Sequence, residues 1–469
     1  MAAPLSVPNP PDHALGRLRL SEVIATLSYA LDLTEGQPRG HCLRCAWIGT
    51  QIGRRIGLGP QALSDLYYAL LLKDSGCSSN ASRLFELYGG DELVVKQRFK
   101  RVDTESYGQL ARFVLRHAGP GEALTARAKR FLDIARHGGV YAGELIRTRC
   151  ERGADIVRRL GFPPAVAAGV HSLDEHWNGK GRPEGLIGDA IPLAARIALL
   201  AQVADVFHAV GGPTAACREA RRRAGTWFDP RLVAVLLDLA GEDWFWAGLD
   251  EDGLDVRIAG LEPLARVITI DEDQLDAITE AFADVIDAKS SFTSGHSRRV
   301  ASYAEAIAAM LQFPRSRRRW LRRAGLLHDI GKLGVSNAVL DKPGRLDEGE
   351  WAAMRRHAAL TEEILSRLSV FRDMAAIAAA HHERLDGNGY PKRLAGAAIA
   401  LETRILTAAD IFDALSAERP YRAAMPVAEA LAIMDRERGT AIDGTCLDAL
   451  KACLADTLQP GAEARLLAV

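Results

Sequence analysis

The stretch LLHDIGK, residues 326–332, places His328 beside Asp329 at the end of an apolar run. A weaker version, LLKDSGC, occupies residues 71–77; it keeps the acid as Asp74 but has a lysine where the histidine stood. Histidine and aspartate are common metal ligands, whereas a protonated lysine is not. The chain therefore carries one pattern twice, and only one version retains both ligands.

Both versions lie within longer segments that align without a gap. Residues 32–76 align with residues 287–331 at an offset of 255 positions. Residues 178–197 align with residues 386–405 at an offset of 208 positions. Because 255 − 208 = 47, the first copy holds an insertion of 47 residues, which falls within 78–140. Self-similarity of this kind predicts a duplicated domain.

Helical periodicity dominates both copies. Apolar residues recur at three- and four-residue spacing in 20–33, 273–288 and 297–311. Ser21 and Asp271 suit the N-termini of two of these helices. Low aromatic content, 6% of the chain, also favours helix over sheet. We therefore predict an all-α protein built from two tandem helical bundle domains.

The region between the copies is predicted to be a linker. Residues 254–270 show partial alternation and contain a proline, which leaves room for a small strand. With 469 residues, the chain is long enough for two domains with separate cores. The predicted parts are a disordered leader at 1–15, a first domain at 16–255, a linker at 256–272 and a second domain at 273–469.

Charge and composition exclude several classes of partner. The net charge is −1, so the basic runs at 218–223 and 315–323 are interpreted as solvated helix faces, and no nucleic-acid polymer is expected. No apolar run approaches the roughly 20 residues that cross a bilayer, so no membrane is expected. Seven scattered cysteines, two of them in an isolated C-x-x-C, favour a reducing cytoplasm.

The second copy gathers seven candidate metal ligands. They are His296, His328, Asp329, His357, His381, His382 and Asp410. A single histidine of this set is more often an ordinary core or surface residue. Two adjacent pairs, HD and HH, each predicted in an apolar helix, favour ligation because buried polar groups need partners. Imidazole with carboxylate suits Fe, Mn or Zn, and seven groups predict two divalent metals that share a carboxylate.

Neighbouring residues suit a phosphate ester. On a continuous helix, Lys332 would share the face of the HD pair and could hold a phosphate oxygen or protonate a leaving alkoxide. Asp410 and Asp413 would share another helix face. A glycine-rich loop after the HH pair would form a substrate wall, and two arginines could bind phosphate in bidentate fashion. The predicted substrate-binding residues are Tyr390, Asp413, Arg419 and Arg422.

With these residues, the segment from about 285 to 455 resembles an HD-GYP domain, the all-helical branch of the HD phosphohydrolase superfamily. The matching motifs are GHSRRVA, LLHDIGK, LDKPGRL, MRRHAALTEEIL, HHERLDGNGYP and ADIFDALSAERPYR. The resemblance implies a metal-dependent phosphodiesterase that hydrolyses cyclic di-GMP to pGpG, to GMP or to both. It also implies that the first copy is a degenerate HD-like domain.

The resemblance implies a role for each ligand. One metal would be held by His296, His328, Asp329 and Asp410, and the other by His357, His381 and His382, with Asp329 bridging. Three-metal members place a glutamate where this chain has Phe292, so two metals, Fe or Mn, are implied. A bridging hydroxide would attack phosphorus, with Lys332 and Asp329 as catalytic residues. Thr361 replaces the family's usual glycine, and we expect little consequence.

The alignment predicts that the first copy has lost its metals. His41 and Asp74 remain, which are too few for two ions. The replacements are Lys73 for His328, Arg149 for His357, Leu173 and Asp174 for His381 and His382, and Gln202 for Asp410. His171 and His176 could substitute only with a slip of one or two residues. We predict that Lys73 pairs with Asp74 and that this domain packs structurally, with a regulatory ligand site as the alternative.

Two other functions stay open for the whole chain. One is a phosphohydrolase for a different cyclic dinucleotide or a nucleotide. The other is a signalling adaptor in which contact with a signalling protein, or with a second copy of the chain, matters more than turnover. Metal analysis and a hydrolysis assay on purified protein would separate these possibilities from cyclic di-GMP hydrolysis.

Overall fold

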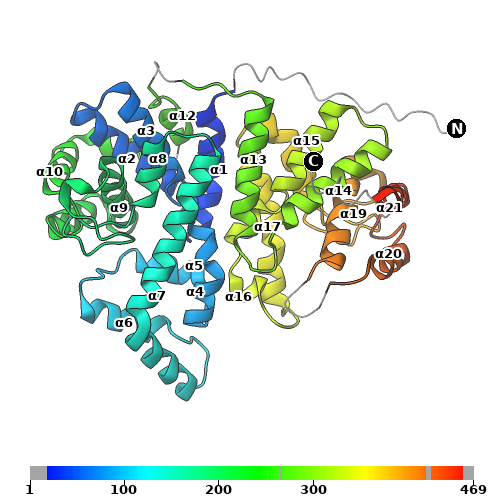
Figure 1. The fold of residues 1–469 in the computed structure, drawn as a ribbon, viewed down its shortest axis with the longest axis horizontal. Helices are drawn as coiled ribbons and strands as arrows, with labels where there is room; N and C mark the ends of the chain where they lie inside the picture. Colours follow the sequence, from blue (N-terminus) through cyan, green and yellow to red (C-terminus); the bar gives the residue numbers. More distant parts are fainter. Residues whose placement is uncertain (1–17, 251, 264–266, 419–423, 458–469) are drawn as a thin grey trace. The chain divides into compact units, whose positions relative to one another are not determined.

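The computed structural model describes residues 18–250, 252–263, 267–418 and 424–457, and its secondary structure is helical (Figure 1). Within these ranges, extended segments pair only as isolated β-bridges, and no β-strand forms. The predicted all-α class is confirmed. The leader predicted at 1–15 lies outside the described residues.

The chain divides into two compact units. The N-terminal unit comprises Leu18–Ile270 together with the short segment Ser336–Ala338, and the C-terminal unit begins at Asp271. The division therefore falls within the predicted linker, 256–272. That region contains a helical turn and one bridge, between Arg19 and Thr269, in place of a small strand.

The helices of the N-terminal unit precede the division. They are α1 (Leu20–Thr34), α2 (His41–Arg55), α3 (Pro60–Leu72), η2 (Cys77–Asn80), α4 (Ala81–Tyr88), α5 (Glu92–Phe99), α6 (Tyr107–His117), α7 (Leu124–Arg159), α8 (Pro164–His171), η3 (Gly188–Ala190), α9 (Leu193–Arg223), α10 (Pro230–Leu239), α11 (Asp243–Ala247) and α12 (Leu254–Ala259).

The helices that follow the division carry the predicted metal site. They are α13 (Glu272–Asp287), α14 (His296–Met310), α15 (Arg315–Leu327), η5 (Ile330–Gly334), α16 (Asn337–Leu340), α17 (Glu348–Ser366), η6 (Ser369–Phe371), α18 (Arg372–Ala379), η7 (Gly396–Ala398), α19 (Leu401–Ser416), α20 (Val427–Arg436) and α21 (Gly444–Thr457).

Helix bounds repeat at the offsets that align the two copies. Both ends of α2 and α3 match those of α14 and α15 after a shift of 255 positions. Both ends of α8 and η3 match those of α18 and η7 after a shift of 208 positions. The segment between these blocks, which holds the 47-residue insertion, forms α4, α5, α6 and the first half of α7, drawn in blue and cyan in Figure 1. It has a small apolar core of its own around Val95, Val102 and Phe113.

Of the two predicted N-terminal caps, Asp271 caps its helix and Ser21 does not. Asp271 caps α13 by accepting a hydrogen bond from the backbone N–H of Gln274. The Gln274 side chain accepts one from the Asp271 N–H, so this prediction is confirmed. The first helix begins at Leu20, one residue before the predicted cap. Ser21 lies inside α1 and is buried, and its hydroxyl donates a hydrogen bond to the Glu262 carboxylate at 2.8 Å.

The arginine run 315–323 is predicted to form a solvated helix face, but three of its arginines form ion pairs with other helices. Arg319 and Arg323 of α15 both pair with Asp276 on α13, and Arg317 pairs with Glu402 at 2.6 Å. The run therefore joins helices of the C-terminal unit through ion pairs. Its arginines pair with acidic residues that lie far away in the sequence.

One described helix, α9, is apolar and long enough to cross a membrane by composition. In the structure, 61% of its most apolar window is buried inside the protein. The helix also breaks at Gly211 and Gly212, whose backbone angles are not helical. Burial of this kind is typical of a core helix, and α9 packs against α2 and α8.

Candidate metal centre

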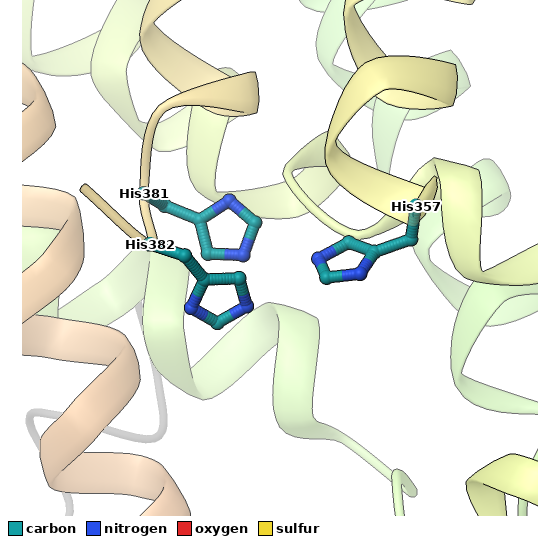
Figure 2. A group of neighbouring side chains, drawn as sticks. All are labelled: His357, His381 and His382. Carbon is teal, nitrogen blue, oxygen red and sulfur yellow. The ribbon is translucent and has the colours of Figure 1, made fainter. Parts of the chain in front are cut away.

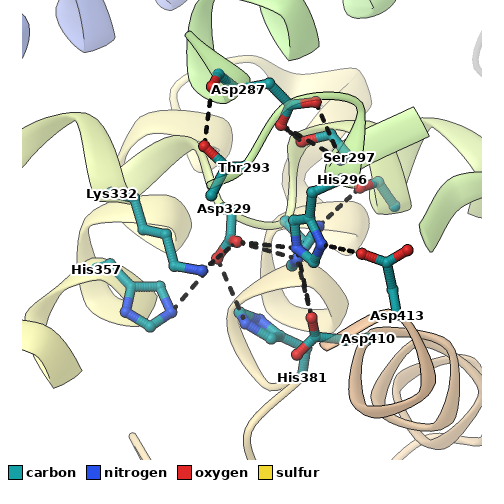
Figure 3. Close-up of polar contacts among 12 residues, drawn as sticks. Asp287, Thr293, His296, Ser297, Asp329, Lys332, His357, His381, Asp410 and Asp413 are labelled. Atoms are coloured by element: carbon teal, nitrogen blue, oxygen red, sulfur yellow. Dashed lines mark hydrogen bonds and ion pairs between the residues drawn. The ribbon is translucent and has the colours of Figure 1, made fainter. Parts of the chain in front are cut away.

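The seven predicted ligands come from five segments of the C-terminal unit. His296 is the first residue of α14, His328 and Asp329 follow α15, His357 lies in α17, His381 and His382 follow α18, and Asp410 lies in α19. Figure 3 shows these segments converging on Asp329. Six of the seven side chains are buried, and His382 is half-buried. The fold therefore gathers residues that are more than one hundred positions apart.

A glycine in the left-handed backbone conformation directly precedes the first predicted ligand. Gly295 has a φ of 68°, and α14 starts directly after it at His296. L residues adopt this conformation only at a cost, whereas glycine does so freely. Gly40 plays the same part before His41 in the N-terminal unit, with a φ of 78°.

The HD turn packs very closely against α17. A Cβ atom on Gly331 would lie 2.0 Å from the carbonyl oxygen of His357, so only glycine fits there. The Thr361 hydroxyl accepts from the Gly331 N–H at 3.1 Å and donates to the His328 carbonyl at 3.0 Å. Thr361, which we expected to matter little, thus ties the turn to the helix that carries His357.

Neither ligand pair lies within a helix, which corrects the prediction. Helix α15 ends at Leu327, and α18 ends at Ala379. Lys332 lies in the 3₁₀ turn η5, and its ammonium nevertheless reaches the Asp329 carboxylate. Directly after each helix, Nδ1 of His328 and of His381 donates to a carbonyl of its last turn, which leaves fewer carbonyls of the helix end unpaired.

Three ligand histidines share one hydrogen-bonding arrangement. His328, His357 and His381 each make a hydrogen bond from Nδ1 to the carbonyl three residues earlier. The distances are 2.7 Å to Gly325, 2.6 Å to Met354 and 2.6 Å to Ala378. A carbonyl only accepts, so Nδ1 carries the proton and Nε2 presents its lone pair. The backbone thus sets the tautomer that metal binding needs.

Several atoms at this centre are buried without a hydrogen-bond partner among the described residues. They are Nε2 of His296, His328, His357 and His381, and Oδ1 of Asp329. Buried polar atoms rarely stay unpaired, because desolvation costs free energy that a bond must offset. Their convergence on one point is explained by ligation.

The Asp329 carboxylate lies between two sets of imidazoles. Its Oδ2 is 3.4 Å from Nε2 of His296 and 3.3 Å from Nε2 of His328. Its Oδ1 is 3.6 Å from Nε2 of His357 and 3.7 Å from Nε2 of His381. Each oxygen therefore faces a different pair, as a carboxylate does when it bridges two ions.

The donor atoms form overlapping groups of ligating size. His296, His328 and Asp410 make one group, and His357, His381 and His382 make another, with all ligand atoms of a group within 4.8 Å of one another. Figure 2 shows the second group, with the three rings facing a common space. The residues present fit two metals, each held by imidazole and carboxylate donors.

Electrostatics favour cations at this centre. Burial lowers the pKa of His357 to about 4 and that of His381 to about 3, so both rings are neutral near pH 7. Burial would raise the pKa of Asp329, but His328 and Lys332 outweigh it and hold the pKa below its usual range. Asp329 is thus a buried carboxylate with neutral His357 and His381 beside one of its oxygens, an arrangement that suits a divalent ion.

Asp413 has a different role from the predicted contact with substrate. Its side chain is 1% exposed, so a ligand cannot reach it. One oxygen accepts from Nδ1 of His296 at 2.7 Å, and the other accepts from Nε of Arg299 at 2.6 Å. Asp413 therefore orients His296 from behind, as carboxylates commonly do for metal-binding histidines.

Asp413→Asn should weaken metal binding by about 10- to 100-fold, because it removes the charge that makes His296 a strong donor. The measurement is metal content after titration with a chelator of known affinity. The exposed Asp448 of α21 gives a matched control, Asp448→Asn, which should bind metal as the wild type does. Unchanged affinity in Asp413→Asn would show that His296 needs no such support.

Tyr390 borders the second histidine group. Its ring centroid lies 4.8 Å from that of His382 and 6.3 Å from that of His357. This position agrees with its predicted place in the substrate wall. Arg419 and Arg422, the other two predicted substrate contacts, lie outside the described residues.

In the N-terminal unit, ion pairs occupy the corresponding positions. The Lys73 ammonium contacts the Asp74 carboxylate and donates to Oε1 of Gln202 at 3.1 Å. Arg149 pairs with Asp174. These five residues align with five ligands of the second copy, so the replacements bind one another where the metals would be held.

The insertion adds a further cation to this cluster. The Lys100 ammonium lies 2.9 Å from Oε2 of Glu35 and 3.7 Å from Oδ1 of Asp74. The nearby donors His41 and Asp205 hydrogen bond to each other at 2.6 Å. Ammonium groups therefore lie beside Asp74, at a position that aligns with a ligand of the second copy, and beside Glu35. That the first copy has lost its metals stays a prediction.

Motifs do not reveal every residue that supports the centre. Arg299 and Thr361 lie within quoted motifs and Lys100 lies outside them, but the sequence does not show the role of any of the three, because each acts through a residue far away in the chain. A signal exists for one of them, since Arg44 and Arg299 are related by the 255-residue offset. Arg44 donates to Asp205 at 2.6 Å, as Arg299 does to Asp413.

Comparisons with known proteins agree with this geometry. A family model described as HD domain matches residues 135–232 and 280–446, one segment in each copy. The chain is 53% identical over 435 residues to 3'3'-cGAMP-specific phosphodiesterase 3 of Vibrio cholerae, and the match covers 93% of this chain and 94% of that protein. It is 38% identical over 189 residues to the cyclic di-GMP phosphodiesterase response regulator RpfG of Xanthomonas campestris, covering 40% and 50%.

A solved structure extends the likeness to the fold. The crystal structure of a cyclic GMP-AMP specific phosphodiesterase of V. cholerae, V-cGAP3, superposes with a TM-score of 0.66 at 49% identity. The match covers 94% of this chain and 99% of that chain.

Proposed function

Since this chain belongs to the HD domain family, among its HD-GYP phosphodiesterases, we propose that it hydrolyses a phosphodiester bond of a cyclic dinucleotide, with 3'3'-cGAMP as the preferred substrate. The observation that carries the proposal is the Asp329 carboxylate, which turns one oxygen to each of two histidine pairs. The motifs alone favour cyclic di-GMP. The relative that matches nearly the whole chain is named for 3'3'-cGAMP, so cyclic di-GMP becomes the second candidate.

Two divalent metals, Fe or Mn, belong to the proposal, because mixed imidazole and carboxylate donors suit them. His296, His328, Asp329 and Asp410 would hold one, and His357, His381 and His382 the other, with Asp329 shared. When bound, such ions neutralise phosphate charge and make bound water acidic enough to act as a nucleophile near neutral pH.

The residues of the chain prepare the site for that chemistry. Backbone carbonyls fix the imidazole tautomers, and Asp413 fixes His296. The Lys332 ammonium, held against Asp329, is placed to neutralise charge on a phosphoryl oxygen or to protonate the leaving alkoxide. Tyr390 beside His382 would confine the substrate on the open side. A cytoplasmic location is part of the proposal, supported by seven free thiols.

We expect kcat/KM for 3'3'-cGAMP to exceed that for cyclic di-GMP by about tenfold or more. Adenine and guanine carry different groups on their Watson–Crick edges, so a site that hydrogen bonds one leaves polar atoms unpaired with the other. The test is hydrolysis of both compounds by the Mn- and Fe-loaded protein. Faster turnover of cyclic di-GMP would make it the substrate, and turnover of neither would favour an adaptor.

A further inference from the structure

A pocket of about 530 Å³ opens on the outer side of Tyr390. Its walls are α17 and the loop after the HH pair. Three arginines line it: Arg355, Arg356 and Arg393. None of the three pairs with an acid among the described residues, and no acidic side chain from that part of the chain lines the pocket. Unpaired guanidinium groups in a concave site attract an anion, and their fork suits phosphate.

The pocket and the metal centre share a wall. The Arg355 guanidinium lies 5.7 Å from the Tyr390 ring centroid, and the same centroid lies 4.8 Å from that of His382 and 6.3 Å from that of His357. Arg355 and His357 are two residues apart on α17. An anion held by Arg355 would thus lie next to a substrate bound at the second histidine group.

The backbone at Arg393 points to a function for this side chain. Its φ is 55°, a left-handed conformation that non-glycine residues rarely adopt. The corresponding residue of the first copy, at an offset of 208, is Gly185, with a φ of 73°. The two loops are held alike, because Glu175 accepts from the Leu186 N–H and Glu383 accepts from the Leu394 N–H, both at 2.9 Å. The catalytic copy therefore bears an arginine where the loop geometry suits glycine.

The geometry points to this pocket as the subsite for the second phosphodiester of the cyclic dinucleotide, with Arg355 and Arg393 as positioning residues. The inference rests on the proposed function. A cyclic dinucleotide carries two phosphodiesters in one ring, and only one of them can lie at the metals. The other remains an anion beside the protein, and the guanidinium groups of this pocket would bind it. A linear dinucleoside monophosphate has both bases but lacks this second group.

The test compares 3'3'-cGAMP with linear GpA, which has a single phosphodiester, as substrates of the metal-loaded full chain. In Arg355→Gln and in Arg393→Gly, KM for 3'3'-cGAMP should rise by about tenfold or more, because each variant loses a charged hydrogen bond. Its kcat should change little, since the interaction is made equally in the ground and transition states. KM for GpA should stay near the wild-type value.

Arg393→Gly also separates binding from folding. Glycine adopts a left-handed φ without strain, so the unfolding midpoint of this variant should not fall. Arg315→Gln, at an exposed arginine that does not line the pocket, is the matched control and should leave both KM values unchanged. Equal increases for both substrates, or no increase in either variant, would overturn the subsite. A wild-type protein that hydrolyses neither compound would overturn the proposed function itself.

Discussion

Asp329→Ala should reduce cyclic dinucleotide turnover by about a thousandfold or more while the protein stays folded. Its carboxylate is the group that faces both histidine pairs, and it also binds the Lys332 ammonium. Removing it takes a ligand from each proposed metal at once, and such metals supply much of the catalytic power of phosphodiesterases. The measurements are kcat with saturating Mn or Fe and metal content by elemental analysis.

A second readout distinguishes loss of metal from loss of structure. The circular dichroism spectrum of Asp329→Ala should match the wild type, because the Lys332 ammonium that loses its partner is 20% exposed and can be solvated. Asp373→Ala, at an exposed aspartate of α18, is the control and should keep full activity and metal. Wild-type turnover by Asp329→Ala would refute the assignment of this centre as the active site.

Lys73→Met should lower the free energy of unfolding of the N-terminal unit by about 3 kcal/mol or more. Both partners of the Lys73–Asp74 pair are fully buried, so the variant leaves a carboxylate without its principal counter-charge. Lys100, at 3.7 Å, compensates only in part. Urea unfolding followed by tryptophan fluorescence reports mainly on this unit, because five of the seven tryptophans lie in it, namely Trp47, Trp177, Trp227, Trp244 and Trp246.

A double variant tests the cause of that destabilisation. Lys73→Met combined with Asp74→Asn removes both charges and should recover most of the loss, because a neutral pair needs no counter-charge. Lys180→Met alters an exposed lysine of the same unit and should change the midpoint little. If Lys73→Met were as stable as the wild type, the ion pair would not stabilise this unit.

Most of the residues at this centre can be predicted from the sequence, because they lie in short motifs and in segments that align between the two copies. The HD and HH pairs stand out as motifs, and the gapless alignment of the copies is enough to place His328 and Lys73 at equivalent helix ends. Helical class and the capping of α13 by Asp271 also follow from short-range rules.

What the sequence could not predict depends on contacts across the fold. Helical periodicity runs past Leu327, so it cannot reveal that α15 ends there or that Nδ1 of His328 binds the Gly325 carbonyl. Asp413 lies one helical turn from Asp410, a predicted ligand, so its position in the sequence suits a substrate contact equally well, and only its burial argues against one. Lys100 comes from the insertion, which has no counterpart in the second copy to align it with.

The hydrogen-bonded set of His41, Arg44 and Asp205 in the N-terminal unit has a consequence for experiments on the other unit. It repeats His296, Arg299 and Asp413, yet no proposed metal depends on it. The N-terminal unit, which we predict to have lost its metals, thus offers a reference for the same three side chains. The change in free energy of unfolding on substituting Asp205 measures what this arrangement contributes to folding. Subtracting it from the change on substituting Asp413 leaves the part that comes from holding an ion.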